Sequence, residues 1–493
     1  MRRFPELPIY TGFNTPDRIE ADVYDLEVLE GEVPRELRGI YYHVRPDPQY
    51  PPLLGEDIYF NGDGIVSMFR FKDGHVDFRC RYVRTEKFVA ERQARRALFG
   101  LYRNPYFDDE SVRGLRRGTA NTHVVYHAGR LYALKEDSPP VLLDPLTLKT
   151  YGYYDFEGQL TSKTFTAHPK IDPQTGEMIA FGYSATGYGS PDIAYYVISP
   201  EGRIVHEAWL RAPYASMVHD FAVTREYVIF PIVPIMYDME RAKRGLSTFA
   251  WDSTREVYLG VLPRYGTGKD VRWFKGPNQF ASHVMNAFNE GSRIYIDTPV
   301  APGNLFPFFP DIHGGGFDRT KATPRLTRWV VDAESSRDGF QSIEMSKFVG
   351  EFPRVDERYL MEPYRHGYLL VQDTELPAHP ALRSASGFQF NCLGHVDLQT
   401  GRHERWFVGP TSSLQEPTFV PRPGSTVEGD GYLLAIANRY DERRSDLLIF
   451  DALKVAEGPL AVVRLPIKLR PGLHGSWVPA ERIPGFEEDR SWD

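Results

Sequence analysis

The sequence predicts an all-β protein, and three observations support that prediction. Aromatic residues make up 14% of the chain, and 42 glycines and 39 prolines supply many turns. Short runs rich in β-branched and aromatic residues recur behind turn residues, as is typical of strands. No linker-like segment divides the 493 residues. Because a β-propeller closes a long all-β chain around one axis, we expect one propeller domain over residues 1–493, with a pair of β-sandwich domains as the alternative.

The expected strands are joined by turns that contain Asp and Gly. These residues suit the positive φ angles of hairpin turns at Asp73-Gly74, in segment 172–176 and in segment 397–401. Residues 86–102 are different, because Phe88, Leu98 and other apolar residues lie near helical spacing there. We therefore expect a helix at 86–102. The expected strands are 129–134, 177–183, 227–233, 293–298, 367–372 and 431–437.

Composition excludes several classes of protein. The net charge of −8 argues against nucleic acid as the main partner. Two cysteines, Cys80 and Cys392, exclude a disulfide scaffold and a cysteine-rich metal site, and they favour a reducing compartment. No apolar leader follows Met1, and the longest apolar run, at 227–236, contains two prolines and falls short of the ~20 residues of a membrane span. We expect a cytoplasmic protein without stable membrane insertion.

Four of the 14 histidines stand among small and apolar residues. A buried imidazole needs a partner, and a metal ion is one such partner. Four imidazoles favour Fe, Cu or Zn over Mg or Ca. The four candidates are His168, His219, His283 and His474. Most of the others are expected beside turns or in polar runs: His75, His127, His206, His366, His379 and His403.

Three glutamates, Glu136, Glu351 and Glu416, also lie beside apolar or proline-rich sequence. Carboxylates next to metal-binding histidines accept the imidazole N–H and fix its tautomer, so three glutamates suit three of the four histidines. Three of the histidines and two of the glutamates form a series with intervals of 58 to 68 residues: His219, His283, Glu351, Glu416 and His474. Such spacing suits equivalent positions in successive propeller blades. Together with Glu136 and His168 it indicates seven blades, although the step between those two residues is shorter.

Other chemistries have weaker support in the sequence. A two-His-one-carboxylate iron site at His395-Val396-Asp397 is the competing metal hypothesis, and it is disfavoured because the tripeptide runs into the 397–401 turn. A glycine-rich phosphate loop and a nucleophile elbow are both missing from the sequence.

Around the four histidines and three glutamates, the sequence resembles the carotenoid cleavage oxygenase family, and within it the lignostilbene dioxygenases. Two segments depart from the family pattern, 43–48 and the motif that begins here with Asn61, and both are expected to be structural. The matching segments keep the family order along nearly the whole chain: 31–39, 59–66, 121–122, 134–136, 168–170, 218–221, 351–354, 416–420 and 474–475.

The resemblance implies a seven-bladed propeller with Fe(II) on its axis. A dome of loops and helix, roughly residues 86–120, would cover the iron-bearing face. The implied iron ligands are His168, His219, His283 and His474. Glu136, Glu351 and Glu416 would surround these ligands, and Thr122 matches a position close to an open iron site.

Phe60, Tyr102 and Lys135 match positions at which lignostilbene dioxygenases and isoeugenol-type relatives hold a 4-hydroxyphenyl ring. Lys135 and Tyr102 would favour the phenolate of a lignin-derived or resveratrol-type stilbene, whose electron-rich double bond reacts with O2 to give two aldehydes. The aromatic segment 306–309, which begins with Phe306, is a candidate cleft wall. Neighbouring residues of a strand point to opposite faces, so Lys135 and Glu136 can serve one site only if the strand ends or bends there.

Two alternatives remain open. The same kind of iron enzyme could act on apocarotenoids or isoeugenol-type phenylpropenoids. Charged residues in the expected helix favour a soluble aromatic substrate over one drawn from a membrane: Glu91, Arg92, Arg95 and Arg96. The second alternative is a propeller that binds a partner without catalysis. The sequence leaves open whether the protein forms a homodimer.

Overall fold

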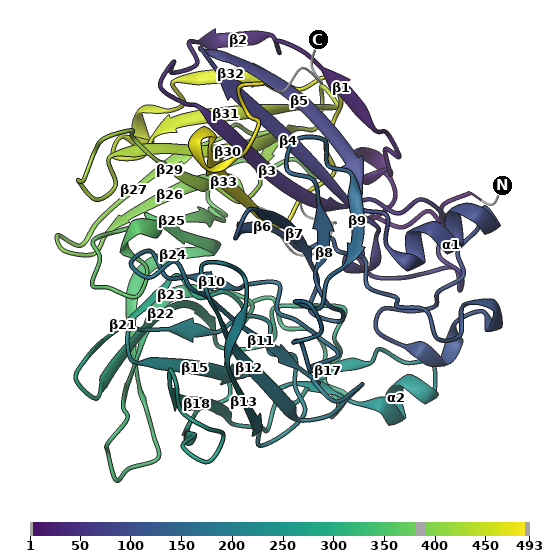
Figure 1. Cartoon of the computed structure of the whole chain (residues 1–493), viewed down its shortest axis with the longest axis vertical. Helices are drawn as coiled ribbons and strands as arrows, with labels where there is room; N and C mark the ends of the chain where they lie inside the picture. Colours follow the sequence, from purple (N-terminus) through teal and green to yellow (C-terminus); the bar gives the residue numbers. More distant parts are fainter. Residues whose placement is uncertain (1–2, 381–389, 489–493) are drawn as a thin grey trace.

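The computed structural model describes residues 3–380 and 390–488, and its antiparallel sheets are arranged around a common centre (Figure 1). Over these residues the sheets form seven blades, which confirms the predicted propeller. Blade 1 contains β1 (Ala21–Val23), β3 (Gly39–Pro46), β4 (Gly64–Lys72), β5 (His75–Tyr82) and β33 (Gly475–Pro479). Blade 2 contains β6 (His123–His127), β7 (Arg130–Leu134), β8 (Val141–Leu143) and β9 (Thr150–Tyr153).

The third and fourth blades follow in sequence order. Blade 3 contains β10 (Lys170–Ile171), β11 (Met178–Tyr183), β12 (Asp192–Ile198) and β13 (Ile204–Arg211). Blade 4 contains β14 (Ala222–Val223), β15 (Tyr227–Ile232), β18 (Val257–Pro263) and β19 (Arg272–Gly276). A separate two-stranded sheet, inserted in blade 4, contains β16 (Ile235–Tyr237) and β17 (Phe249–Trp251).

Blades 5 and 6 share the long strand β24 (Gln341–Val355). Its first half pairs with β23 and its second half, from Gly350, pairs with β25, so one continuous sheet bends from one blade into the next. Blade 5 also contains β20 (Phe280–Ala281), β21 (Asn286–Glu290), β22 (Arg293–Ala301) and β23 (Arg325–Asp332). Blade 6 also contains β25 (His366–Val371), β26 (Cys392–Asp397) and β27 (Arg402–Phe407).

The two ends of the described chain close the ring. The C-terminal strand β33 pairs with β3, while the N-terminal strand β2 (Val28–Gly31) pairs with β32. Each end is therefore bound into a sheet formed by the other end. Blade 7 contains β2 with β28 (Ser412–Leu414), β29 (Thr418–Pro421), β30 (Gly431–Arg439), β31 (Arg444–Asp451) and β32 (Ala461–Arg464).

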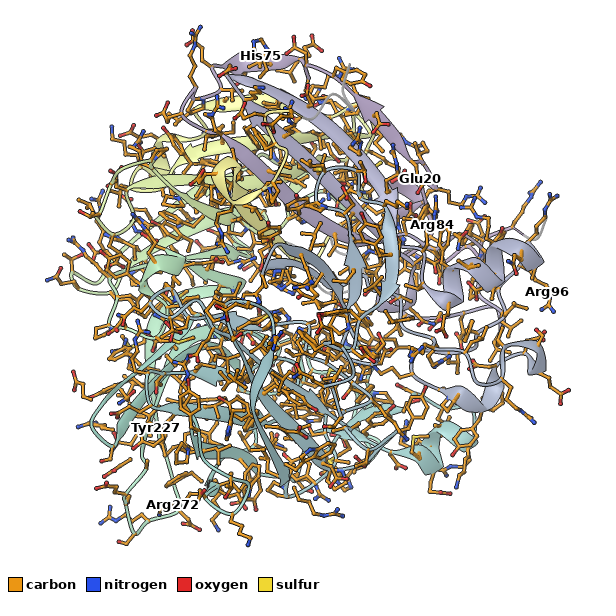
Figure 2. The ribbon with its side chains drawn as sticks, in the orientation of Figure 1. Glu20, His75, Arg84, Arg96, Tyr227 and Arg272 are labelled. Carbon is orange, nitrogen blue, oxygen red and sulfur yellow. The ribbon has the colours of Figure 1, made fainter. Side chains whose placement is uncertain are left out.

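The six strands expected from the sequence are all present, as β7, β11, β15, β22, β25 and β30. Apolar side chains from adjacent blades pack together; Phe69 and Phe78 of blade 1, for example, share a buried cluster with Leu434 and Ile436 of blade 7. His75 lies at the outer rim, as expected of a turn residue (Figure 2). None of the helices in the described part of the chain has the length and apolar character of a membrane span.

The helix expected at 86–102 is shorter than predicted. Helix α1 spans Glu86–Ala94. Thr85 caps its N-terminus, because its side chain accepts the Phe88 N–H, and Arg95 caps its C-terminus with a left-handed φ of 55°. Glu91, one of the charged residues of the expected helix, is buried, and its side chain accepts hydrogen bonds from the backbone N–H groups of Leu98 and Phe99. These bonds redirect the chain away from the helix axis, so the apolar pattern beyond residue 94 belongs to a loop.

Short helical segments lie in the connections between strands and near the two ends of the described chain. The second α-helix is α2 (Met239–Lys243), and Figure 1 shows α1 and α2 on the same side of the ring. The 3-10 helices are η1 (Gly12–Asn14), η2 (Tyr59–Asn61), η3 (Pro105–Phe107), η4 (Glu110–Val112), η5 (Glu357–Tyr359), η6 (Val455–Glu457) and η7 (Ala480–Arg482).

Candidate metal centre

The four histidines singled out in the sequence meet at one point. His168 lies two residues before β10, and His474 directly precedes β33. His219 lies three residues before β14, and His283 lies between β20 and β21. These short strands belong to blades 3, 1, 4 and 5, so the closed ring brings four distant segments together. One ligand nitrogen from each ring lies within 4.8 Å of the others.

Three of the imidazoles are fixed by glutamates. His283 Nδ1 donates to Glu351 Oε2 at 2.6 Å, and His474 Nδ1 donates to Glu416 Oε1 at 2.8 Å. His219 Nδ1 makes the same bond to Glu136 Oε1. In a neutral imidazole bound in this way, the other nitrogen, Nε2, carries the lone pair that a metal requires.

The spacing of the Nε2 atoms suits a shared metal ion. His219 Nε2 lies 3.1 Å from both His168 Nε2 and His283 Nε2. Lone pairs at that distance repel unless a cation lies between them. A divalent metal binds imidazole nitrogen at about 2.1 Å, which separates neighbouring ligands at right angles by about 3.0 Å. The side chains therefore fit a metal ion held by four imidazoles.

The electrostatics of the site also suit a cation. Burial, together with the neighbouring imidazoles, lowers the pKa of His168 and of His474 well below the ordinary value, which keeps both rings unprotonated. Burial alone raises the pKa of Glu136, but the charges of His219 and Arg103 lower it below its usual range. Two neutral imidazoles, those of His168 and His474, therefore share the site with an ionised carboxylate.

An apolar pocket adjoins three of the four histidines, His219, His283 and His474. Six of the residues expected at the substrate or near the metal line it: Phe60, Tyr102, Thr122, Lys135, Glu136 and Phe306. Sequence reasoning missed further lining residues, although three of them flank or closely precede candidate residues: Met217, Phe352 and Leu473. Val233, Ile235 and Phe280 complete the apolar wall and carried no comparable signal, whereas Phe309 belongs to the 306–309 segment that was expected to form a cleft wall.

Lys135 lies at this pocket because β7 ends at Leu134. The alternation of a regular strand stops there, so both Lys135 and Glu136 reach the site. Lys135 Nζ donates to Phe60 O and to Asn121 Oδ1, each at 3.0 Å, and lies 5.1 Å from the centre of the Tyr102 ring. Burial lowers the pKa of this ammonium to about 8. The amine is therefore not a solvated strand residue.

Aromatic edges organise the same pocket. The Phe60 ring meets the Phe306 ring edge to face, with the centroids 5.9 Å apart. Phe306 in turn meets Phe280 edge to face at 5.3 Å. Such contacts hold rings at fixed angles and leave apolar faces for a flat aromatic ligand.

Polar residues around the metal candidates were also missed. The ring of His123 lies 5.3 Å from that of His474 and 5.6 Å from that of His168, and its Nδ1 bonds to Ala167 O. Arg103 and Arg354 bind the second oxygens of Glu136 and Glu416. Arg354 closes the 351–354 segment already singled out, whereas Arg103 and His123 belong to no segment that pointed to the metal site.

The competing iron hypothesis fails on geometry. His395 and Asp397 lie on β26 of blade 6. His395 Nε2 is bonded to His366 Nδ1 at 3.0 Å, and the Asp397 carboxylate is paired with Arg365. These side chains do not belong to the histidine cluster found among the described residues.

Comparisons with known proteins agree with this arrangement. The family model described as retinal pigment epithelial membrane protein matches residues 14–479. The chain is 51% identical to lignostilbene-α,β-dioxygenase isozyme III of Sphingomonas paucimobilis, over 98% of this chain and 99% of that protein. It is 45% identical to isoeugenol monooxygenase of Pseudomonas nitroreducens, over 96% and 98%. The crystal structure of Pseudomonas brassicacearum lignostilbene dioxygenase is 46% identical, with a TM-score of 0.94, over 97% and 100%.

Proposed function

Because the chain belongs to the retinal pigment epithelial membrane protein family of carotenoid oxygenases, we propose that it is an iron-dependent dioxygenase acting on 4-hydroxystilbenes. It cleaves the central C=C bond of lignostilbene-type or resveratrol-type substrates with O2. One observation carries the choice of substrate: a buried ammonium, Lys135, and the Tyr102 ring lie in the same apolar pocket as three of the histidines.

The metal is Fe(II), held by Nε2 of His168, His219, His283 and His474. When bound, ferrous iron supplies the activation of O2 that side chains cannot provide. Thr122 lies in the wall of the pocket that adjoins three of these imidazoles. Glu136, Glu351 and Glu416 keep the rings in the tautomer that presents Nε2.

Lys135 and Tyr102 receive the 4-hydroxyl group of the substrate. A phenol has a pKa near 10, as tyrosine does, and an adjacent ammonium lowers it. Burial raises the pKa of Tyr102, so its hydroxyl stays protonated and donates to the phenolate. The phenolate transfers electron density through the ring onto the alkene, which makes the alkene a better partner for O2. Phe60 and Phe306 hold the ring in place by aromatic contact.

The stilbene and one O2 together supply all the atoms and electrons of the two products. Both atoms of one O2 become the carbonyl oxygens of two aromatic aldehydes, and the central C=C bond is broken. The side chains add no electrons. Lys135 and Tyr102 are already protonated and take up no proton, so the phenol proton passes to water and is regained from water when the product leaves. The roles of the other pocket residues are to orient the ring and to exclude water.

Isoeugenol-type phenylpropenoids are the second candidate substrate. Isoeugenol monooxygenase of Pseudomonas putida is 46% identical over 95% of this chain, and such a substrate carries the same 4-hydroxyphenyl ring. The Lys135 and Tyr102 contacts alone do not separate the two classes. The second aromatic ring of a stilbene separates them, because that ring has to pack against the apolar wall of the pocket, which includes Val233, Ile235 and Phe280.

The test is a substrate panel on iron-loaded protein. O2 uptake and chromatography of the aldehydes are measured with a 4-hydroxystilbene, its 4-methoxy analogue, isoeugenol and an apocarotenoid. We expect one O2 consumed for two aldehydes and fastest turnover of the 4-hydroxystilbene. Fastest turnover of isoeugenol would favour the second candidate, and no turnover after anaerobic loading would favour a non-catalytic binding propeller.

The proposal includes the dome and the cellular location. We assign residues 86–120 to a dome over the pocket, since Tyr102 lines the pocket from within this segment. We place the protein in the cytoplasm, because Cys80 and Cys392 are both buried and free, which suits a reducing compartment.

A further inference from the structure

Two pairs of adjacent residues meet beside the pocket. Tyr102 and Lys135 line it, and their neighbours in sequence, Arg103 and Glu136, bind each other. Arg103 Nη2 donates to Glu136 Oε2 at 2.8 Å, and the two side chains are only 2% and 3% exposed. A single backbone step therefore links each side chain of the phenol seat, Tyr102 and Lys135, to a member of this ion pair.

Arg103 is held from several sides. Its Nη1 donates to the Tyr183 hydroxyl at 2.6 Å, and its guanidinium carbon lies 5.6 Å from the Tyr102 ring and 5.7 Å from the Phe249 ring. Its backbone φ is 52°, a conformation that residues other than glycine rarely adopt. Such a conformation persists only where the surroundings determine it, and it is common at functional sites.

The two oxygens of Glu136 have different partners. Oε1 accepts from His219 Nδ1, and Oε2 accepts from Arg103. A carboxylate bound through both oxygens cannot rotate, so Arg103 fixes the direction from which His219 is held. The guanidinium also compensates the carboxylate charge, which limits how strongly Glu136 attracts the imidazole proton.

The three glutamates are not equivalent in this respect. Arg354 binds Glu416 Oε2 at 2.8 Å, whereas Glu351 Oε1 has no hydrogen-bond partner among the described residues. Neither Arg354 nor its sequence neighbours Pro353 and Val355 line the aromatic pocket. The arginine joined to the phenol seat is thus the one that holds Glu136.

We propose that Arg103 is a positioning residue that couples occupation of the phenol seat to the His219 side of the metal site. The inference rests on the proposed iron-dependent cleavage of 4-hydroxystilbenes. A phenol that contacts Tyr102 and Lys135 orders both backbone segments, and this ordering tightens the Arg103–Glu136 pair behind them. By linkage, the metal then binds more tightly when the phenol is present, and the phenol binds more tightly when the metal is present.

The test is Arg103→Met, with metal binding as the main readout. The Fe(II) dissociation constant is measured anaerobically by competition with a chelator, with and without a 4-hydroxystilbene. In the wild type we expect the stilbene to tighten metal binding. In Arg103→Met we expect metal affinity to fall about 10- to 100-fold, with the stilbene effect lost. Arg103→Lys retains one charged donor and should restore part of both.

Arg264→Met is the matched control. Arg264 is also buried and paired with two carboxylates, those of Asp172 and Glu177, but neither of these carboxylates binds a candidate metal ligand and Arg264 does not line the aromatic pocket. Its loss should lower the melting temperature and change metal affinity by no more than about twofold. Equal metal affinity in wild type and Arg103→Met, an unchanged stilbene effect, or an equal loss in Arg264→Met would each overturn the inference.

The two levels of the proposal fail separately. Wild-type protein that binds no Fe(II), or that leaves the 4-hydroxystilbene intact, contradicts the proposed function. A different result contradicts only the role of Arg103. In that case the wild type binds Fe(II) and cleaves the 4-hydroxystilbene, and Arg103→Met has the same metal affinity and the same stilbene effect as the wild type. If Arg103→Met does not fold, Arg103→Lys carries the comparison, because a primary ammonium cannot bind Glu136 and Tyr183 with the same geometry.

Discussion

Replacing Lys135 with methionine separates substrate recognition from metal binding. Methionine keeps a similar length and removes the ammonium that donates to Phe60 O and Asn121 Oδ1. A buried hydrogen bond to a charged group contributes about 1.5–3 kcal/mol. At 1.4 kcal/mol for each factor of ten, kcat/KM for a 4-hydroxystilbene should fall about 10- to 100-fold. The 4-methoxy analogue has no proton to lose, so its kcat/KM should change much less.

The assay is O2 uptake with both substrates, together with analysis of bound iron. Iron content should not change, because the Lys135 amine bonds to Phe60 and Asn121 and not to a candidate ligand. Lys87→Met is the control: Lys87 is equally buried, between Asp63 and Glu91, and does not line the pocket. Its loss should lower stability and should not discriminate between the two substrates.

The same amine predicts a pH dependence. Burial lowers the pKa of Lys135 to about 8, so the ammonium is charged below that pH and neutral above it. We expect kcat/KM for the 4-hydroxystilbene to fall as the pH rises through about 8. Lys135→Met should lack this limb. An equal loss on both stilbenes, or a limb that persists in the variant, would refute the phenolate argument.

Three further predictions follow from the contacts at the site. His219→Ala should lose bound iron and activity together, measured by metal analysis beside O2 uptake, and full iron content would contradict the four-histidine site. Tyr102→Phe removes a neutral donor and should lower kcat/KM for the 4-hydroxystilbene about 3- to 10-fold, with the 4-methoxy analogue unaffected. Gly472→Ala would place a Cβ 1.9 Å from the His43 ring and should lower the free energy of unfolding by about 1–3 kcal/mol. Gly316→Ala meets no atom within 4 Å and should be close to neutral in the same denaturation assay.

Local patterns were sufficient for the strands and insufficient for the end of the helix. A strand such as 227–233 is recognised from its own residues, because β-branched and aromatic side chains suit a pleated, buried surface. Helix α1 ends where Arg95 turns left-handed and Glu91 binds the backbone of the following loop. Those bonds involve a folded loop, so the apolar spacing beyond residue 94 does not reveal them.

The site was partly visible for a similar reason. His219 and Glu351 were noticed because each stands among apolar neighbours, where a polar side chain needs a partner. Which glutamate binds which histidine was not visible, because Glu136 and His219 come from different blades and meet only in the closed ring. Arg103 was missed because its burial depends on contacts with Tyr183 and Phe249, which come from distant segments of the chain.

The buried charges explain why four neutral ligands suit a divalent ion here. Arg103 compensates Glu136 and Arg354 compensates Glu416, so Glu351 is the carboxylate left to offset the metal. A dication with one unpaired carboxylate leaves about one positive charge in a buried site, which is less costly than an uncompensated dication. The negative charge of a substrate phenolate is not needed to offset the remaining positive charge at the metal, because the Lys135 ammonium already balances the phenolate. The 4-methoxy analogue should therefore bind to iron-loaded protein and react slowly, rather than fail to bind.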